Sequence, residues 1–155
     1  MDTVGKQEVE SLGKKECWEI LASHVVGRLA VIVDGHPDIF PVNYVVDDGS
    51  VIFRTGAGTK LQWLLEPRPV ALEIDGYDPH TELAWSVVLR GSAREITRAQ
   101  GRADAKALPL DPWQGGPKDH FIRVGSLNLS GRRFHVTKAD IWKTPLSDPR
   151  LASFE

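Results

Sequence analysis

"VVGRLAVIVDGHPDIFPVNYVVDDGSVIFRT", from Val25 to Thr55, contains three apolar, β-branched runs separated by short turn sequences. The runs at 25–33, 39–46 and 51–55 have the length and the Val and Ile content of β-strands. The "DDG" sequence at 47–49 predicts a hairpin, because Asp and Gly tolerate the positive φ angles of a tight turn. No helix lies between these runs, which disfavours a doubly wound parallel sheet.

The remaining chain continues this pattern of short strands with a few helices. Gly91 interrupts one long strand near its middle, where we expect a bulge or bend. The capping-box pattern Thr97-x-x-Gln100 predicts the start of a helix that reaches about Leu108. The other predicted elements are helices at 14–23 and 59–66, strands at 70–74, 82–96 and 120–129, a loop at 75–81, a turn at 130–132 and a seventh strand from 133.

These elements predict a mainly β fold with short helices, in which six or seven antiparallel strands form a barrel or a sandwich. The chain has 155 residues, which suits one domain. Its formal charge of −2 gives no electrostatic reason to expect nucleic acid as a partner. A single cysteine, Cys17, and the absence of a long apolar run or a signal-peptide pattern lead us to expect a cytoplasmic protein with no membrane partner.

The sequence that follows the third strand has the residues needed to hold an anion. Gly56 and Gly58 permit a close approach of the backbone, and the next helix would begin near Thr59 with its free N–H groups. Charged and hydroxyl donors surround this point: Arg54, Thr55, Thr59 and Lys60. From spacing alone, a strand-to-helix loop with solvated Arg and Lys is an equal alternative, because no P-loop pattern occurs here.

Several motifs occur in a fixed order along the chain. They are G-R-L-A at 27–30, P-V-N-Y at 41–44, F-R-T-x-x-G-T-K at 53–60, V-A-L-E at 70–73 and W-S-V at 85–87. In this order and spacing, the chain resembles the pyridoxamine 5′-phosphate oxidase-like flavoproteins, which include small actinobacterial flavin- and deazaflavin-dependent oxidoreductases. The resemblance extends from Cys17 to Val136.

The resemblance implies a homodimeric split β-barrel with two flavin sites across the subunit interface. The cofactor is expected to be FMN, or alternatively the deazaflavin F420. Residues 1–12 would be a flexible lead-in, 13–145 a single FMN-binding domain and 146–155 a tail. The resemblance assigns the FMN phosphate to Arg54, Thr55, Thr59 and Lys60, the isoalloxazine ring to Pro41, Val42 and Asn43, and the ring or ribityl chain to Trp85 and Ser86.

The chain also departs from the true pyridoxamine phosphate oxidases. Their C-terminal basic and aromatic segment has only Arg132 and Arg133 as partial counterparts here, so we do not expect vitamin B6 oxidation. For the acidic tail of F420, basic residues are available at Arg68, Lys118, Arg123 and Arg132. The five histidines show no metal-ligand spacing, so no metal is expected.

The expected activity is transfer of hydride or electrons to a small organic acceptor. A non-catalytic flavin or F420 carrier is the alternative, and a structural dimer with a vestigial pocket is a third possibility. No catalytic residue can be named, because the cofactor supplies most of the chemistry in such enzymes.

Overall fold

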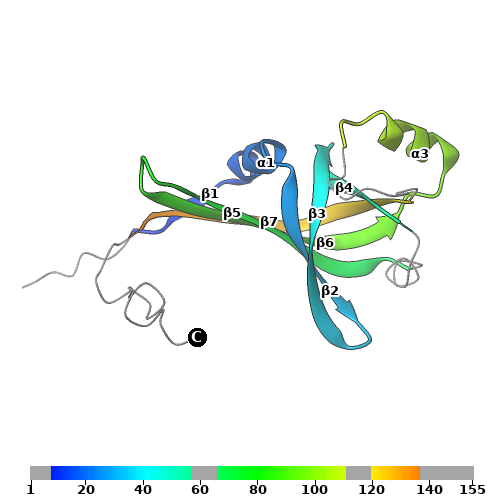
Figure 1. The fold of residues 1–155 in the computed structure, drawn as a ribbon, viewed down its shortest axis with the longest axis horizontal. Helices are drawn as coiled ribbons and strands as arrows, with labels where there is room; N and C mark the ends of the chain where they lie inside the picture. The colour runs from blue at the N-terminus through cyan, green and yellow to red at the C-terminus, as the bar shows by residue number, and fades with distance from the viewer. Residues whose placement is uncertain (1–7, 57–65, 111–119, 137–155) are drawn as a thin grey trace, which may run out of the picture.

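The computed structural model describes residues 8–56, 66–110 and 120–136. Seven strands and two helices are formed by these residues (Figure 1). In chain order they are β1 (Glu10–Leu12), α1 (Lys14–Ala22), β2 (Val26–Val33), β3 (His36–Asp47), β4 (Ser50–Thr55), β5 (Arg68–Asp78), β6 (Leu83–Glu95), α3 (Ala99–Lys106) and β7 (His120–His135).

The strands form one antiparallel sheet that closes on itself. The order β7-β4-β3-β2-β5-β6 returns to β7, because β6 pairs with β7 along its whole length. β1 adds to the outer edge of β7, opposite residues 131–133. The prediction of a mainly β split barrel is therefore confirmed.

Two tight hairpins fix the register of the first three barrel strands. Asp34 and Gly35 connect β2 to β3 with φ angles of 52° and 75°, and Asp48 and Gly49 connect β3 to β4 with 45° and 67°. Positive φ at both central residues is the geometry that follows the natural twist of a hairpin. The hairpin predicted from the Asp-Gly sequence at 47–49 is confirmed.

The predicted irregularity at Gly91 is also present. The pairing of β6 with β7 shifts register between Arg90 and Gly91. A Cβ atom at Gly91 would lie only 1.9 Å from the carbonyl oxygen of Gly125. The two backbones therefore approach closely at this bulge, and only glycine fits.

Several boundaries differ from the predictions. The predicted turn at 130–132 is wrong: β7 continues through it, paired with β6 on one side and with β1 on the other. Residues 10–12 of the predicted lead-in form β1, and β5 extends through Asp78 into the predicted loop.

The helix after β6 also differs from its prediction. It begins at Ala99 behind Arg98, with no side-chain cap, so the Thr97 capping box is not formed. The predicted helix at 59–66 lies almost entirely outside the described residues, and so does the chain beyond Val136.

The far ends of β5, β6 and β7 extend beyond the barrel together with β1. We call this part the wing; it comprises residues 10–12, 74–78, 83–88 and 129–135 and lies at the left in Figure 1. α1 packs on one face of the wing, with Cys17 and Leu21 fully buried. α3 covers a separate cluster on the barrel, in which Ile52, Ala105, Leu110 and Phe121 pack together. Each helix therefore covers a different part of the sheet, and much of the outer face of the wing stays open.

Candidate functional site

The barrel is split between β3 and β4, next to the predicted cofactor residues. The β3–β4 ladder runs from Asp47 opposite Ser50 to Tyr44 opposite Phe53 and ends there. Beyond that point, β3 pairs only with β2, and β4 continues to Thr55 paired only with β7. Asn43 and Arg54 would be the next pair in this register. The split therefore begins where the predicted ring-binding strand meets the predicted phosphate-binding strand.

Arg54 and Thr55 form the β4 side of the split. The guanidinium carbon of Arg54 lies 4.8 Å from the ring centroid of Phe121, its neighbour on β7, so the cation rests on an aromatic face. The hydroxyl of Thr55 donates a long hydrogen bond of 3.4 Å to the carbonyl of Gly56. Both side chains are half-buried. Thr59 and Lys60, the other two predicted phosphate ligands, lie outside the described residues.

Residues 41–43 form the β3 side of the split, and their side chains alternate between the two faces of the strand. Pro41 is exposed and Val42 packs against the core. The Asn43 amide donates a hydrogen bond of 3.4 Å to the carbonyl of Val25, which orients it on the outer face. Pro41 and Asn43 are therefore brought together on one face, whereas Val42 contributes its side chain to the interior.

Trp85 and Ser86 lie on the wing, and their side chains point to opposite faces of β6. The ring of Trp85 covers Gly76, where a Cβ atom would lie 2.6 Å from it, and its centroid is 4.8 Å from that of His24. Ser86 is opposite Asp75 on one side and Arg132 on the other. The two residues therefore cannot both direct their side chains at one ligand on one face of this sheet.

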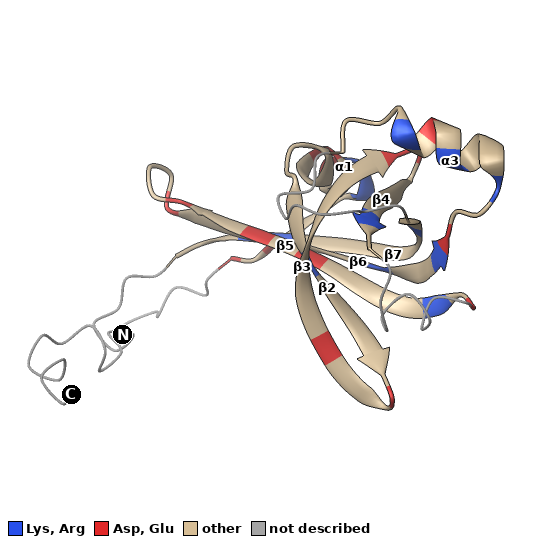
Figure 2. Cartoon of the chain, turned by 45° about the vertical axis from the view of Figure 1, so that its right-hand side comes forward, with Lys and Arg blue, Asp and Glu red and all other residues tan. Residues whose placement is uncertain are grey.

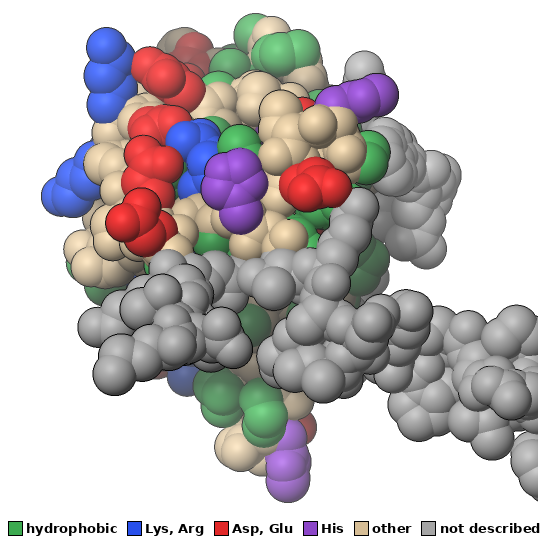
Figure 3. Space-filling model, turned by 90° about the vertical axis from the view of Figure 1, so that its left-hand side faces the viewer, with side chains coloured by type: hydrophobic (Ala, Val, Ile, Leu, Met, Phe, Trp, Pro, Cys, Tyr) green, Lys and Arg blue, Asp and Glu red, His purple; other side chains and the backbone are tan. Residues whose placement is uncertain are grey.

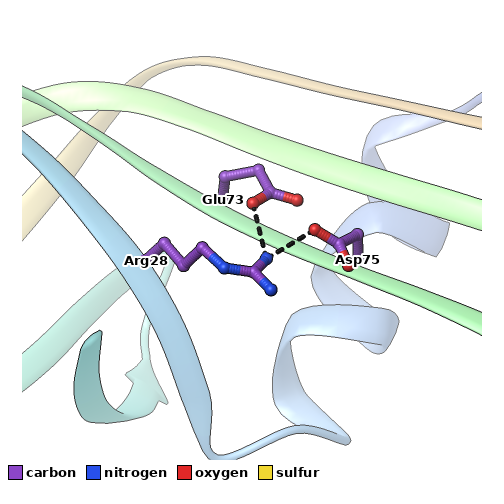
Figure 4. A network of polar contacts seen from close by, with 3 residues as sticks. All are labelled: Arg28, Glu73 and Asp75. Carbon is purple, nitrogen blue, oxygen red and sulfur yellow. Dashed lines mark hydrogen bonds and ion pairs between the residues drawn. The ribbon is translucent and has the colours of Figure 1, made fainter. Parts of the chain in front are cut away.

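Two of the sequence motifs meet in an ion-pair network on the outer face (Figure 4). Arg28, from G-R-L-A, donates hydrogen bonds to Glu73, from V-A-L-E, at 3.0 Å and to Asp75 at 2.5 Å. Burial, and next the hydrogen bond with Asp75, raise the pKa of Glu73 above its usual range. The hydrogen bond with Glu73 and the nearby Arg28 lower the pKa of Asp75. The two carboxyl groups therefore interact with each other as well as with the single arginine. Sequence reasoning missed this network, because 45 residues separate Arg28 from Glu73.

A second polar pair lies beside Thr55. His120, the register partner of Thr55 on β7, has its Nδ1 2.6 Å from a carboxylate oxygen of Glu95. Both side chains are largely buried, with exposed fractions of 27% and 19%. This pair fixes the orientation of the imidazole at the end of the barrel where the predicted phosphate ligands begin.

The other predicted basic residues have different surroundings. Arg123 donates hydrogen bonds to Asp47 at 3.2 Å and to Ser50 at 2.5 Å, and Arg133 pairs with Glu16 at 2.7 Å. Arg68 and Arg132 are exposed, and Lys118 lies outside the described residues. Basic and acidic residues are interspersed over the described strands and helices (Figure 2), and on the face in Figure 3 they lie side by side. No continuous basic stripe is visible in these views.

His24 and Cys17 both lie in structural surroundings. His24 follows α1 and donates from Nδ1 to the carbonyl of Ile20 at 2.8 Å, as a helix-end residue does. Cys17 is fully buried. Within the described residues no group of His, Cys, Asp or Glu is placed to hold a metal ion, and neither helix there has the length and apolarity required to traverse a bilayer.

This chain belongs to the pyridoxamine 5′-phosphate oxidase family, whose sequence profile matches residues 13–133. An uncharacterized protein of Mycobacterium tuberculosis is 33% identical over 132 residues, which cover 82% of this chain and 86% of that protein. A solved structure from Corynebacterium glutamicum is 34% identical with a TM-score of 0.75, covering 83% of this chain and 100% of that one. The structure of an FAD binding protein from Mycobacterium smegmatis is 37% identical with a TM-score of 0.69, covering 81% and 98%.

Proposed function

We propose that this protein binds a flavin at the split between β3 and β4 and uses it as an oxidoreductase. The end of the β3–β4 ladder carries this proposal, because Asn43 on β3 and Arg54 on β4 are the first residues beyond it. Family membership and the FAD-binding relative support the same conclusion. When bound, the flavin would supply the chemistry of hydride or electron transfer.

The residues at the split have the donors that this ligand needs. Arg54 offers a planar fork for a phosphate, and its position over Phe121 limits the freedom it would lose on binding. The hydroxyl of Thr55, whose hydrogen bond to Gly56 is long at 3.4 Å, can turn to donate to a phosphate oxygen. Lys60 and Thr59 would complete the phosphate site, and Asn43 would contribute a polar contact along the ring.

The choice of flavin follows from which phosphates must be held. FMN, FAD and F420 all carry a phosphate next to their ribityl-type chain, so one clamp could serve each of them. FMN is the cofactor that the sequence motifs favour, and F420 is the alternative. The M. smegmatis relative adds FAD as a third candidate.

The double variant Thr55→Ala with Lys60→Ala tests the phosphate assignment. We expect it to weaken flavin binding by roughly 2–4 kcal/mol, at about 1–2 kcal/mol for each charge-assisted contact. Lys106→Ala, on the last turn of α3, is the matched control and should leave affinity unchanged. Fluorescence titration measures both. Equal affinity in the double variant and the wild type would refute the phosphate assignment.

Turnover separates an enzyme from a carrier. The side chains described at the split include no general acid or base; they belong to Pro41, Val42, Asn43, Arg54 and Thr55. A non-catalytic flavin carrier would also lack such a group. An oxidoreductase should accelerate reduction of an added acceptor by a nicotinamide cofactor or by reduced F420, as absorbance of the donor reports. A carrier should bind equally tightly and give only the rate of free flavin.

The proposed site is completed by a second copy of this chain. Light scattering at micromolar concentration should therefore give the mass of a homodimer. A monomer under these conditions would argue against a site built across an interface.

A further inference from the structure

A separate hollow of about 320 Å³ lies on the outer face of the wing, between β1, β6 and β7. It is open to solvent, and most of its lining residues are polar. Its residues are Val9, Ser11, Ser86, Val88, Arg90, Ser130, Gly131 and Arg132. Only Ser86 and Arg132 among them were singled out from the sequence.

Period-two alternation places the polar lining on one face. Ser86, Val88 and Arg90 alternate along β6, and Ser130 and Arg132 are the β7 partners of Val88 and Ser86. Arg90 and Arg132 thus reach the hollow from different strands. Together the two guanidinium groups and the three serine hydroxyls provide up to about thirteen hydrogen-bond donors, more than the roughly four lone-pair sites of one carboxylate.

The two arginines of the hollow have no acidic partner in the part of the chain that the structure describes. Within residues 8–56, 66–110 and 120–136, neither Arg90 nor Arg132 forms an ion pair or a side-chain hydrogen bond, whereas Arg28, Arg123 and Arg133 each pair with a carboxylate. Two guanidinium groups around one hollow repel each other unless an anion joins them.

Two carboxylates next to the hollow are already engaged. Glu73 and Asp75 are the β5 partners of Val88 and Ser86, so they lie next to the hollow. Arg28 holds both of them, at 3.0 and 2.5 Å, from the opposite side. The Arg28 network therefore holds both acidic groups on the β2 side, and neither of them forms an ion pair with Arg90 or Arg132.

We propose that this hollow binds a phosphate-type oxyanion through Arg90, Arg132 and the hydroxyls of Ser11, Ser86 and Ser130. The anion can come from two sources: the additional phosphate of a dinucleotide flavin such as FAD, or a phosphorylated substrate. Only the first source rests on the proposed flavin function. The hollow itself is inferred from its own residues.

Calorimetric titration with inorganic pyrophosphate tests the hollow without any flavin. The wild type should bind it, and Arg90→Gln and Arg132→Gln should each weaken binding by about tenfold or more, since losing one charge-assisted contact is worth at least about 1.4 kcal/mol. Arg94→Gln is the matched control, because Arg94 is an exposed arginine on the same strand outside the hollow. No binding by the folded wild type, or equal weakening in the Arg94 variant, would overturn the proposal.

The same variants distinguish the two sources. If the anion belongs to the cofactor, Arg90→Gln and Arg132→Gln should weaken FAD binding by about tenfold while FMN binding stays unchanged. If it belongs to a substrate, both flavins should bind as in the wild type while pyrophosphate affinity falls. A protein that binds pyrophosphate in the hollow but binds no flavin would refute the proposed function and leave this inference standing.

Discussion

The two faces of the wing are built from the same strands but have opposite characters. One face is covered by α1, where Cys17 and Leu21 are fully buried and Arg133 is neutralised by Glu16. The other face is open, and Arg132, the adjacent residue, lines a hollow without an acidic partner among the described residues. Arg132 and Arg133, which are neighbours on β7, therefore have different roles. The covered face stabilises the fold, and the open face is available for a ligand.

Truncating the covered face should have the largest effect. Leu21→Ala should lower the free energy of unfolding by about 3 kcal/mol, because it leaves a cavity under α1. Val88→Ala, at a half-buried position on the open face, should cost about 1 kcal/mol or less. Urea denaturation monitored by tryptophan fluorescence measures both. Similar losses in the two variants would contradict the difference between the faces.

Removing one buried hydroxyl tests how α1 is anchored. The Tyr44 hydroxyl donates a hydrogen bond of 2.7 Å to the carbonyl of Leu21, near the end of α1. Tyr44→Phe should cost about 1 kcal/mol, because that carbonyl loses a buried donor. Tyr77→Phe, on an exposed tyrosine of the wing, is the control and should change stability little. An unaltered urea midpoint for Tyr44→Phe would show that this bond does not anchor the helix.

The covered face should also make the protein sensitive to alkali. Burial, and to a lesser degree Glu16, raise the pKa of Cys17, and burial raises the pKa of Tyr44. The folded state therefore keeps these protons to higher pH than the unfolded state, whose thiol and phenol titrate near about 8.5 and 10. The free energy of unfolding should fall as pH rises above about 8.5, and fall further above about 10. Tyr44→Phe should flatten the second fall, whereas constant stability from neutral pH upward would contradict the prediction.

Substitutions of Arg132 and Arg133 should have the smallest effects on stability, and they compare the open face of the wing directly with the covered face. Arg133→Gln should cost about 0.5–1 kcal/mol, because its pairs with Glu10 and Glu16 are partly exposed. Arg132→Gln should change stability by less than about 0.5 kcal/mol, and should act on anion binding instead. Thermal unfolding and pyrophosphate titration of both variants separate the two roles. The comparison fails if Arg133→Gln also abolishes pyrophosphate binding in a folded protein.

The parts of the fold that could be predicted from the sequence are those with local causes. The hairpin at 47–49 follows from Asp-Gly chemistry, and the bulge at Gly91 from a glycine inside a strand. β1 could not be predicted, because its three residues carry no pattern and their partners lie some 120 residues away. The Ser-Gly-Arg sequence at 130–132 resembles a turn locally, yet pairing with strands on both sides keeps it extended.

The residues of the candidate site can also be divided into those that the sequence predicts and those that only the fold reveals. The motifs that carry the resemblance predicted Asn43 and Arg54, and the fold places them on facing strands. The opposite directions of Trp85 and Ser86 follow from strand alternation and could have been predicted. The Arg28 network and the hollow around Arg90 could not, because each joins residues from strands whose pairing only the closed barrel reveals.

The measurement that tests the central claim most directly is a titration of the purified apo-protein with FMN, FAD and F420 side by side, followed by cofactor fluorescence. We predict micromolar or tighter binding of at least one of them, lost or strongly weakened in the Thr55→Ala, Lys60→Ala variant. Binding of none of the three by a correctly folded protein would contradict the proposed flavin site at the split between β3 and β4.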